Sequence, residues 1–174
     1  IASCLVGSEM CIRDRKYLKL IVEAILPFVG GNLIGKYAVK NARKDYSKND
    51  KPPLSPPGYI FPIVWPILYI SMGVAFVLAK RKGNVTTLNS THYSQLGLNF
   101  LWSLLYFRYK LRGAAVVESY VLFTAVTTTT VTYYQSNKVS GSLMLPYVAW
   151  SGYASYLATG NWLLNKDKAH YTSQ

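Results

Sequence analysis

Residues 51–73, KPPLSPPGYIFPIVWPILYISMG, decide the fold of this 174-residue chain. No charged residue occurs from position 54 to position 79, and a run of this length can cross a hydrocarbon core that needs about 20 apolar residues. The first turn of a helix tolerates proline because its amides have no intrahelical partner. Deeper in a bilayer a freed carbonyl needs a partner in protein or water, so this helix is expected to face a packed or wetted interior. A proline-stiffened, aromatic-rich membrane segment indicates a binding site more than a plain anchor.

The composition is that of a membrane protein, with 51% hydrophobic, 14% aromatic and only 15% charged residues. Five apolar spans follow one another, and connectors as short as 108–112 imply antiparallel neighbours. The expected fold class is an all-α integral membrane protein, a bundle of five transmembrane helices. The five spans are residues 17–35, 57–79, 93–107, 113–134 and 141–164.

Residues 1–15 are expected to be a non-native leader. Positions 5–15, LVGSEMCIRDR, match a translated adapter of sequencing libraries, and the chain starts with Ile1. The alternative is a genuine amphipathic leader. The single membrane domain is then residues 16–174, and because Cys4 and Cys11 are the only cysteines, that domain has no disulfide or thiolate to offer.

Lysine and arginine cluster between the spans, which explains the net charge of +12 without a nucleic-acid partner. The first loop, the third loop and the C-terminus share one face with eleven basic residues, against six on the other face. The positive-inside tendency therefore predicts that the first loop and the C-terminus are cytosolic. The eleven are Lys36, Lys40, Arg43, Lys44, Lys48, Lys51, Arg108, Lys110, Arg112, Lys166 and Lys168; the six are Lys16, Lys19, Lys80, Arg81, Lys82 and Lys138.

Within the spans, Gly31 and Gly35 have the four-residue spacing that lets helices approach closely, either inside the chain or in a homodimer. Glu23 and Glu118 lie near span ends, so solvated interfacial carboxylates are the preferred interpretation over a partnered pair or a cavity.

The third span carries a polar and aromatic stripe. Gln95, Asn99, Trp102 and Tyr106 recur every three or four residues and therefore share one helical face. Spacing alone favours hydrogen bonds between helices over a pocket lining. The run of threonines at 127–130 can bond back to carbonyls of its own helix and receives no chemical role.

Three motifs in order, PPGYIFPIVWPILYISMG, QLGLNFLWSLLYF and LPYVAW followed by YASYL, resemble the TspO/MBR family from about residue 27 to about residue 165. The resemblance implies a five-helix bundle, often dimeric, with a pocket beneath the first loop. It also implies planar lipophilic ligands: porphyrins such as protoporphyrin IX, sterols such as cholesterol, and isoquinoline or benzodiazepine drugs.

The family's motifs can be matched residue by residue. The second-helix motif is matched by Pro56, Pro57 and Trp65, and the third-helix Asn-x-x-Trp by Asn99 and Trp102. The fifth-helix Pro-Tyr-x-Ala-Trp is matched by Pro146, Tyr147, Ala149 and Trp150. The resemblance also implies that Ala154 and Leu157 line the pocket. The complete predicted ligand-binding set is Tyr59, Phe61, Trp65, Gln95, Asn99, Trp102, Tyr147, Trp150, Ala154 and Leu157.

The chain departs from the family at Leu54, where tryptophan is usual, and at Ala158, where asparagine is usual. Thr159–Gly160 and Leu163 replace the tyrosine and arginine of the animal cholesterol motif, which weakens the expectation of sterol binding there.

The expected function is reversible binding of porphyrins or other planar lipophiles, in transport, sensing or tetrapyrrole homeostasis. Neither a cofactor nor a metal is expected, because His92 and His170 are interpreted as separate surface histidines. The alternative is light- and oxygen-dependent breakdown of bound porphyrin. A eukaryotic source would imply the outer mitochondrial membrane.

Overall fold

The computed structural model describes residues 2–39, 47–168 and 171, without the side chains of residues 2–14 and 16. The described part is helical, which confirms the predicted fold class of five helices. Helix α4 runs on into a short π-helix, η1 (Leu104–Arg108). The five long helices are α1 (Ala2–Ala38), α3 (Phe61–Lys80), α4 (Val85–Ser103), α5 (Arg112–Ser136) and α6 (Lys138–Asn165).

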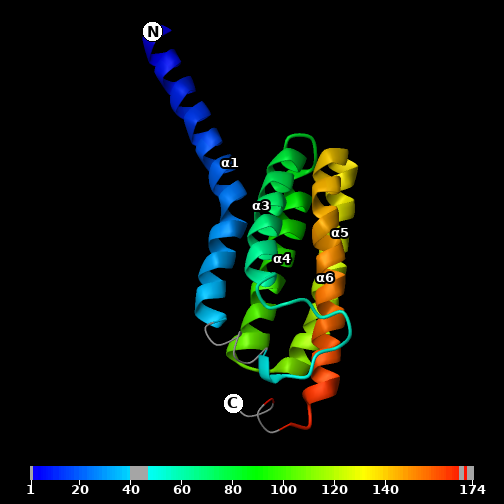
Figure 1. Ribbon diagram of the computed structural model, residues 1–174. Coiled ribbons are helices and arrows are strands. Elements are labelled where there is room, and N and C mark those ends of the chain that lie inside the picture. The colour runs from blue at the N-terminus through cyan, green and yellow to red at the C-terminus, as the bar shows by residue number, and fades with distance from the viewer. Residues whose placement is uncertain (1, 40–46, 169–170, 172–174) are drawn as a thin grey trace.

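Helices α3 to α6 stand side by side, and the C-terminal half of α1 leans against α3 (Figure 1). The N-terminal part of α1 extends away from the bundle, so this helix begins well before the predicted start at residue 17. Residues 47–60, which precede α3, cross the end of the bundle where α6 finishes (Figure 1). Of the basic residues expected there, Lys40, Arg43 and Lys44 lie outside the described residues.

Local signals in the sequence set the helix starts. Pro62 occupies the first turn of α3, where the missing amide costs nothing. Asn84 Oδ1 accepts hydrogen bonds from the amides of Thr86 and Thr87 at 3.0 and 3.3 Å and so caps α4. Asn137 caps α6 in the same way through the amide of Val139 at 3.0 Å.

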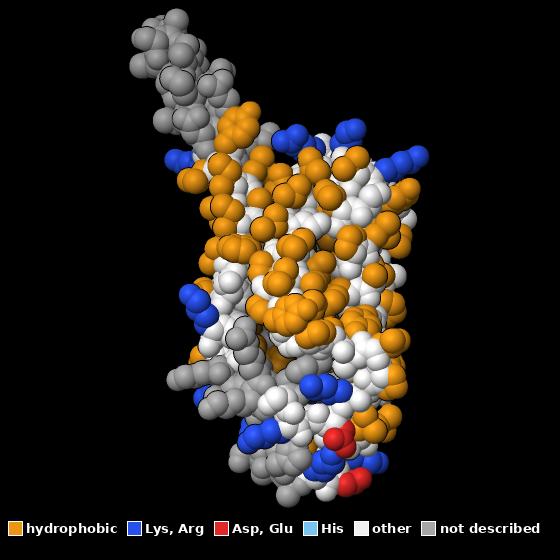
Figure 2. All heavy atoms as spheres, viewed as in Figure 1, with side chains coloured by type: hydrophobic (Ala, Val, Ile, Leu, Met, Phe, Trp, Pro, Cys, Tyr) orange, Lys and Arg blue, Asp and Glu red, His pale blue; other side chains and the backbone are white. Residues whose placement is uncertain are grey.

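The outside of the bundle is apolar. Figure 2 shows hydrophobic side chains as a broad band around the middle of the molecule, with lysine and arginine gathered mostly at its two ends. Three segments within the described helices are long and apolar enough to cross a membrane: Tyr17–Ala38, Phe61–Lys80 and Arg112–Ser136. The exposed residues of α3 include the apolar side chains of Ile63, Ile67, Ile70 and Val74, as expected of a stripe that faces lipid.

Close contact between α1 and α3 depends on glycine. A methyl group on Gly73 would collide with the carbonyl of Ala24, and one on Gly31 would collide with the ring of Tyr69. Small residues let transmembrane backbones approach in this way. A methyl group on Gly35 would meet nothing within 4 Å, so of the two predicted packing glycines only Gly31 is in tight contact within this chain.

The prediction of solvated carboxylates at Glu23 and Glu118 is wrong. Glu23 is buried, and both of its oxygens accept a hydrogen bond from Lys80 Nζ at 2.8 Å. Glu118 is only 8% exposed and lies on the inner face of α5. Position near a span end did not decide exposure, because neighbouring helices cover both positions.

The interpretation of His92 as a surface residue is also wrong. Its exposure is 0%, its Nδ1 lies 2.8 Å from the Tyr133 hydroxyl, and its ring stacks on Phe76 with centroids 3.8 Å apart. The helix begins at Val85 and not near residue 93, which turns His92 inward. His170 lies outside the described residues.

The threonines of α5 behave as predicted. The hydroxyls of Thr127, Thr128, Thr129 and Thr130 each donate to the carbonyl four residues earlier, at 2.8–2.9 Å. Their polar atoms are thereby satisfied inside their own helix.

Candidate ligand-binding site

Asn99 stands at the centre of the predicted site. Its side chain is fully buried and links two other helices: the Tyr69 hydroxyl of α3 donates to Asn99 Oδ1 at 2.6 Å, and Asn99 Nδ2 donates to the Tyr147 hydroxyl of α6 at 2.9 Å. Three helices are therefore joined at one polar point within an apolar bundle. A buried amide with fixed partners of this kind orients the groups around it.

Trp65 covers this polar point. Its ring stacks on Tyr69 with centroids 5.6 Å apart and meets Tyr147 edge to face at 6.4 Å. Tyr69 lies four residues after Trp65, one turn along the same face of α3. This spacing could have placed Tyr69 among the predicted site residues, but it was not included.

A second aromatic group lies toward the first loop. Phe61 meets Trp150 edge to face at 6.0 Å, and Trp150 meets Tyr153 at 5.7 Å. The indole nitrogen of Trp150 is buried and has no hydrogen-bond partner among the described residues. Trp65, Phe61 and Trp150 thus line the facing sides of α3 and α6.

Trp102 makes its ring contacts at the C-terminal end of α4, where η1 follows. It stacks on Tyr106 at 5.1 Å and meets Phe107 edge to face at 5.7 Å, both in η1. Its indole nitrogen is also buried without a partner in the described part of the chain. The two predicted tryptophans of α4 and α6 therefore each hold an unused hydrogen-bond donor.

The remaining predicted residues fall into three environments. Gln95 is fully buried and donates to the sulfur of Met72 at 3.1 Å. Leu157 is buried and Ala154 half-buried on α6. Tyr59 is 61% exposed in the loop before α3, so the structure leaves it apart from the interior group.

The first loop is fastened to α6. The Tyr156 hydroxyl donates to the carbonyl of Pro53 at 2.9 Å, and the Tyr153 hydroxyl donates to that of Leu54 at 2.5 Å. About two and a half turns further along α6, Asn165 exchanges two hydrogen bonds with the backbone of Asp50, at 2.9 and 2.8 Å. Residues 50–54 therefore form a strap across the α6 side of the site. Sequence motifs pointed to this loop but not to these partners.

An open groove of about 430 Å³ lies elsewhere, between α4 and α5. Hydroxyls along it, such as those of Thr124 and Thr128, already bond to carbonyls of their own helix. The groove has the character of a lipid-contacting furrow, whereas the predicted site is filled by its own contacting rings. The groove is lined by Ser90, Thr91, Ser94, Val121, Thr124, Ala125, Thr128 and Thr129.

Known proteins share this sequence pattern. The sequence model of the TspO/MBR family matches residues 24–163. The chain is 33% identical over 150 residues to the tryptophan-rich protein TspO of Archaeoglobus fulgidus, covering 85% of this chain and 97% of that protein. It is 29% identical over 148 residues to the translocator protein of Bos taurus, covering 82% and 87%. It is 30% identical over 113 residues to the tryptophan-rich sensory protein of Cereibacter sphaeroides, covering 64% and 71%.

Proposed function

The chain belongs to the TspO/MBR family of membrane proteins, and on this premise we propose that it reversibly binds planar lipophilic ligands between α3, α4 and α6. Porphyrins such as protoporphyrin IX are the first candidates, with sterols and isoquinoline or benzodiazepine compounds as further ones. Binding would serve transport, sensing or tetrapyrrole homeostasis. The names of the relatives, translocator and sensory protein, are in keeping with these roles.

The observation that carries the proposal is the contact of Trp65 with Tyr69 and Tyr147 over the buried amide of Asn99. Flat rings in offset or edge contact can exchange one aromatic neighbour for another, and each such pair contributes about 0.5–1.5 kcal/mol beyond area burial. A planar ligand that separates these rings would therefore regain the contacts it breaks. Asn99 supplies the fixed polar group that orients such a ligand.

Two unused donors favour a ligand with acceptor groups. A buried indole N–H without a partner costs about 1–3 kcal/mol, a cost that a ligand carbonyl or carboxylate would remove. Trp102 and Trp150 each present such a group on helices that flank the site. Exposed Lys48 and Lys51 of the first loop can meet propionates by charge-assisted hydrogen bonds.

We place the first loop and the C-terminus on the cytosolic side. The end of the bundle formed by the first loop, the third loop and the C-terminus has eleven basic residues, against six at the other end. For a eukaryotic source we propose the outer mitochondrial membrane as its location, with the protein as a monomer or homodimer. Protease protection of either end in sealed mitochondria tests the placement.

Titration of protoporphyrin IX into the full chain in nanodiscs, followed by its absorbance, tests the proposed binding. Saturable binding in the wild type, weakened about tenfold or more in Trp65→Ala and Trp102→Ala, is the expected result. Trp162→Ala is the matched control, because Trp162 lies beside Gly113 of α5 and Lys166 and not among the rings that α3 and α6 share. Linear uptake that all variants share would show only partition into lipid. Spectra taken in light and in darkness separate reversible binding from light-dependent breakdown.

A further inference from the structure

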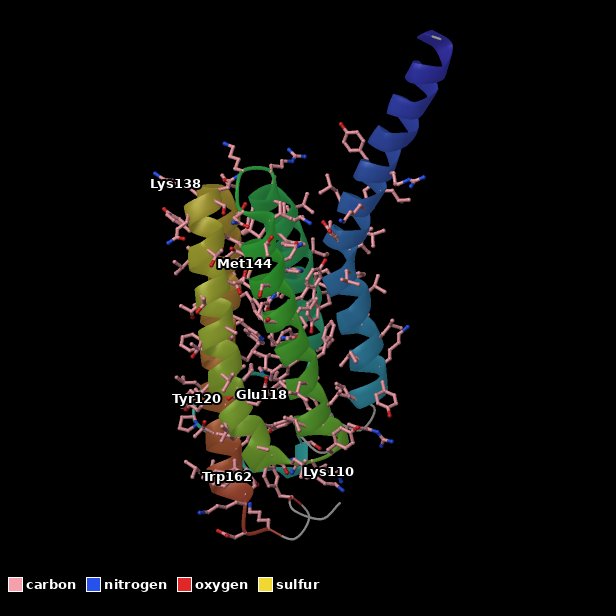
Figure 3. All side chains as sticks on the ribbon, turned by 180° about the vertical axis from the view of Figure 1, so that it is seen from behind. Lys110, Glu118, Tyr120, Lys138, Met144 and Trp162 are labelled. Carbon is pink, nitrogen blue, oxygen red and sulfur yellow. The ribbon has the colours of Figure 1, made fainter. Side chains whose placement is uncertain are left out.

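Glu118 is the acidic member of the inner stripe of α5, whose other buried residues include Ala115, Leu122 and Val126. Figure 3 shows its side chain extending from α5 into the bundle. It is 8% exposed, and neither carboxylate oxygen has a hydrogen-bond partner among the described residues. A carboxylate inside a membrane bundle is costly unless a partner or function retains it.

Glu23 shows how the same chain treats a carboxylate that serves the fold. That group is buried to the same degree, but Lys80 binds both of its oxygens at 2.8 Å. Among the described residues Glu118 has no equivalent cation: Arg112, on the same helix, donates to the carbonyl of Tyr171 at 2.9 Å and lies over the Tyr171 ring at 3.8 Å. The contrast separates a structural carboxylate from one that the fold leaves without a partner.

The register of α4 and α5 brings Trp102 opposite Glu118. Thr129 donates to the carbonyl of Thr91 across these antiparallel helices at 3.2 Å. Trp102 lies eleven residues after Thr91, and Glu118 lies eleven residues before Thr129. Eleven residues make about three helical turns. Trp102 therefore lies on the same face of α4 as Thr91, Glu118 lies on the same face of α5 as Thr129, and the two side chains are at about the same level of the bundle. The unused indole donor of Trp102 and the unused acceptors of Glu118 therefore belong to one region.

Helix α6 has a further acceptor about one turn away. Ser155 donates to the carbonyl of Ser119 at 3.1 Å, which sets the residue beside Glu118 against this part of α6. On the same segment Asn161 donates to the Leu157 carbonyl at 2.9 Å, while its Oδ1 is buried without a partner in the described part of the chain. The π-helix η1 follows Trp102 directly, and π-helical turns are frequent at functional sites.

We propose that Glu118 is a second anchor of the ligand site and accepts a hydrogen bond from an N–H or ammonium group of a planar lipophile. The inference rests on the proposed function and narrows its ligand class. Planar ligands that are nitrogen bases or carry an N–H group are expected to bind more tightly than neutral rings without such a group. Both oxygens of Glu118 are buried acceptors without a hydrogen bond among the described residues, and such acceptors suit a ligand that donates. The net charge of +12 opposes general attraction of cations, so preference for a cationic ligand must come from a local group.

Two acridines test this assignment. 9-Aminoacridine is a protonated planar base with N–H donors at neutral pH, whereas acridine has the same ring system, no N–H group and no charge. Their affinities are measured by fluorescence on the full chain in nanodiscs of zwitterionic lipid. The proteins compared are the wild type, Glu118→Gln, Glu118→Asp and, as a matched carboxylate control, Glu23→Gln.

The wild type is expected to bind 9-aminoacridine at least about tenfold more tightly than acridine, as a charge-assisted hydrogen bond allows. Glu118→Gln should abolish this preference without changing acridine affinity, and Glu118→Asp should keep part of it. Glu23→Gln should leave the preference intact. Replacing an unpaired buried charge by a neutral amide favours folding, and thermal unfolding of each variant checks this point.

An unchanged preference in Glu118→Gln overturns the assignment, and so does failure of 9-aminoacridine to bind saturably. Protoporphyrin IX titrated into the same discs separates the two proposals. Porphyrin binding without a Glu118-dependent acridine preference retains the proposed function and removes this inference. Glu118-dependent binding of 9-aminoacridine without porphyrin binding supports the anchor and removes porphyrin as the ligand.

Discussion

Tyr69 donates its phenolic proton to Asn99 across 2.6 Å, and this bond leaves the amide nitrogen of Asn99 to donate to Tyr147. One amide therefore satisfies two buried hydroxyls from two different helices. The arrangement makes Asn99 important for the stability of the bundle as well as for any ligand above it.

Asn99→Leu should destabilise the bundle, because it keeps the volume and leaves both tyrosine hydroxyls without this partner. A buried group without a partner costs about 1–3 kcal/mol, so the midpoint of unfolding in detergent should fall clearly. The triple variant Asn99→Leu, Tyr69→Phe, Tyr147→Phe should recover most of the loss, because no buried polar group then remains unpaired. A triple variant no more stable than Asn99→Leu would show that packing, and not hydrogen bonding, sets the cost.

The ion pair of Glu23 and Lys80 should behave as a buried one. The side chains of Glu23 and Lys80 are each only 9% exposed. Lys80→Met should therefore leave an uncompensated buried carboxylate and lower the free energy of unfolding by about 3–5 kcal/mol. The double variant Glu23→Leu, Lys80→Met should regain most of this loss. Equal stability of wild type and Lys80→Met in the same unfolding assay would contradict the buried pair.

Gly73→Ala should push α1 away from α3, because the added methyl group collides with the backbone carbonyl of Ala24. The expected result is a lower thermal midpoint and faster digestion between α1 and α3. Gly97→Ala is the matched control on α4, where the added methyl group meets nothing within 4 Å. That control should be neutral or more stable by up to about 1 kcal/mol, since alanine is the better helix former.

Leu54 adopts φ of 62° in the strap and is 86% exposed. A left-handed conformation costs a residue with a Cβ about 1–2 kcal/mol, so Leu54→Gly should be tolerated or modestly stabilising. Leu54→Val should loosen the strap, because a β-branched residue fits this conformation less well. Thermal unfolding of the two variants side by side gives the comparison, and a more stable valine variant would contradict the assigned conformation.

Removing the two hydroxyls that hold the strap should expose the first loop. The double variant Tyr153→Phe, Tyr156→Phe keeps both rings but frees the carbonyls of Pro53 and Leu54. Trypsin should then cleave after Lys48 several times faster than in the wild type, as for any loop with a lower cost of local opening. Tyr120→Phe, which loses a hydroxyl contact with Thr159 elsewhere on α6, serves as the control.

Much of the fold followed from elementary patterns. Five apolar stretches, their short connectors and the prolines at the start of α3 were enough to predict five antiparallel helices. The burial of polar residues was harder to predict. His92 follows the polar stretch NVTTLNST, which conceals a helical turn, and the signal that was missed is Asn84 as its cap. Recognising that cap would have extended the helix and turned His92 inward.

The site was predictable only in part. Asn99 and Trp65 could be predicted from residue spacing and from the family motifs. The structure places both where three helices meet. The partners of Glu23 and the isolation of Glu118 depend on how α1 and α5 pack against their neighbours, which no local pattern encodes. The strap is a similar case, because its hydrogen bonds join residues about a hundred positions apart.

The exposed threonines of α5, Thr124 and Thr128, present an unusual surface to the bilayer. Because each of these two hydroxyls donates to a carbonyl of its own helix, the group left pointing outward is a methyl. To an acyl chain such a helix resembles one built of valine, although its mean hydropathy of 1.3 is lower than the 2.0 of α3. Hydropathy scales that count every threonine as polar therefore understate how well this helix dissolves in lipid, and a Thr128→Val chain should insert no more readily than the wild type.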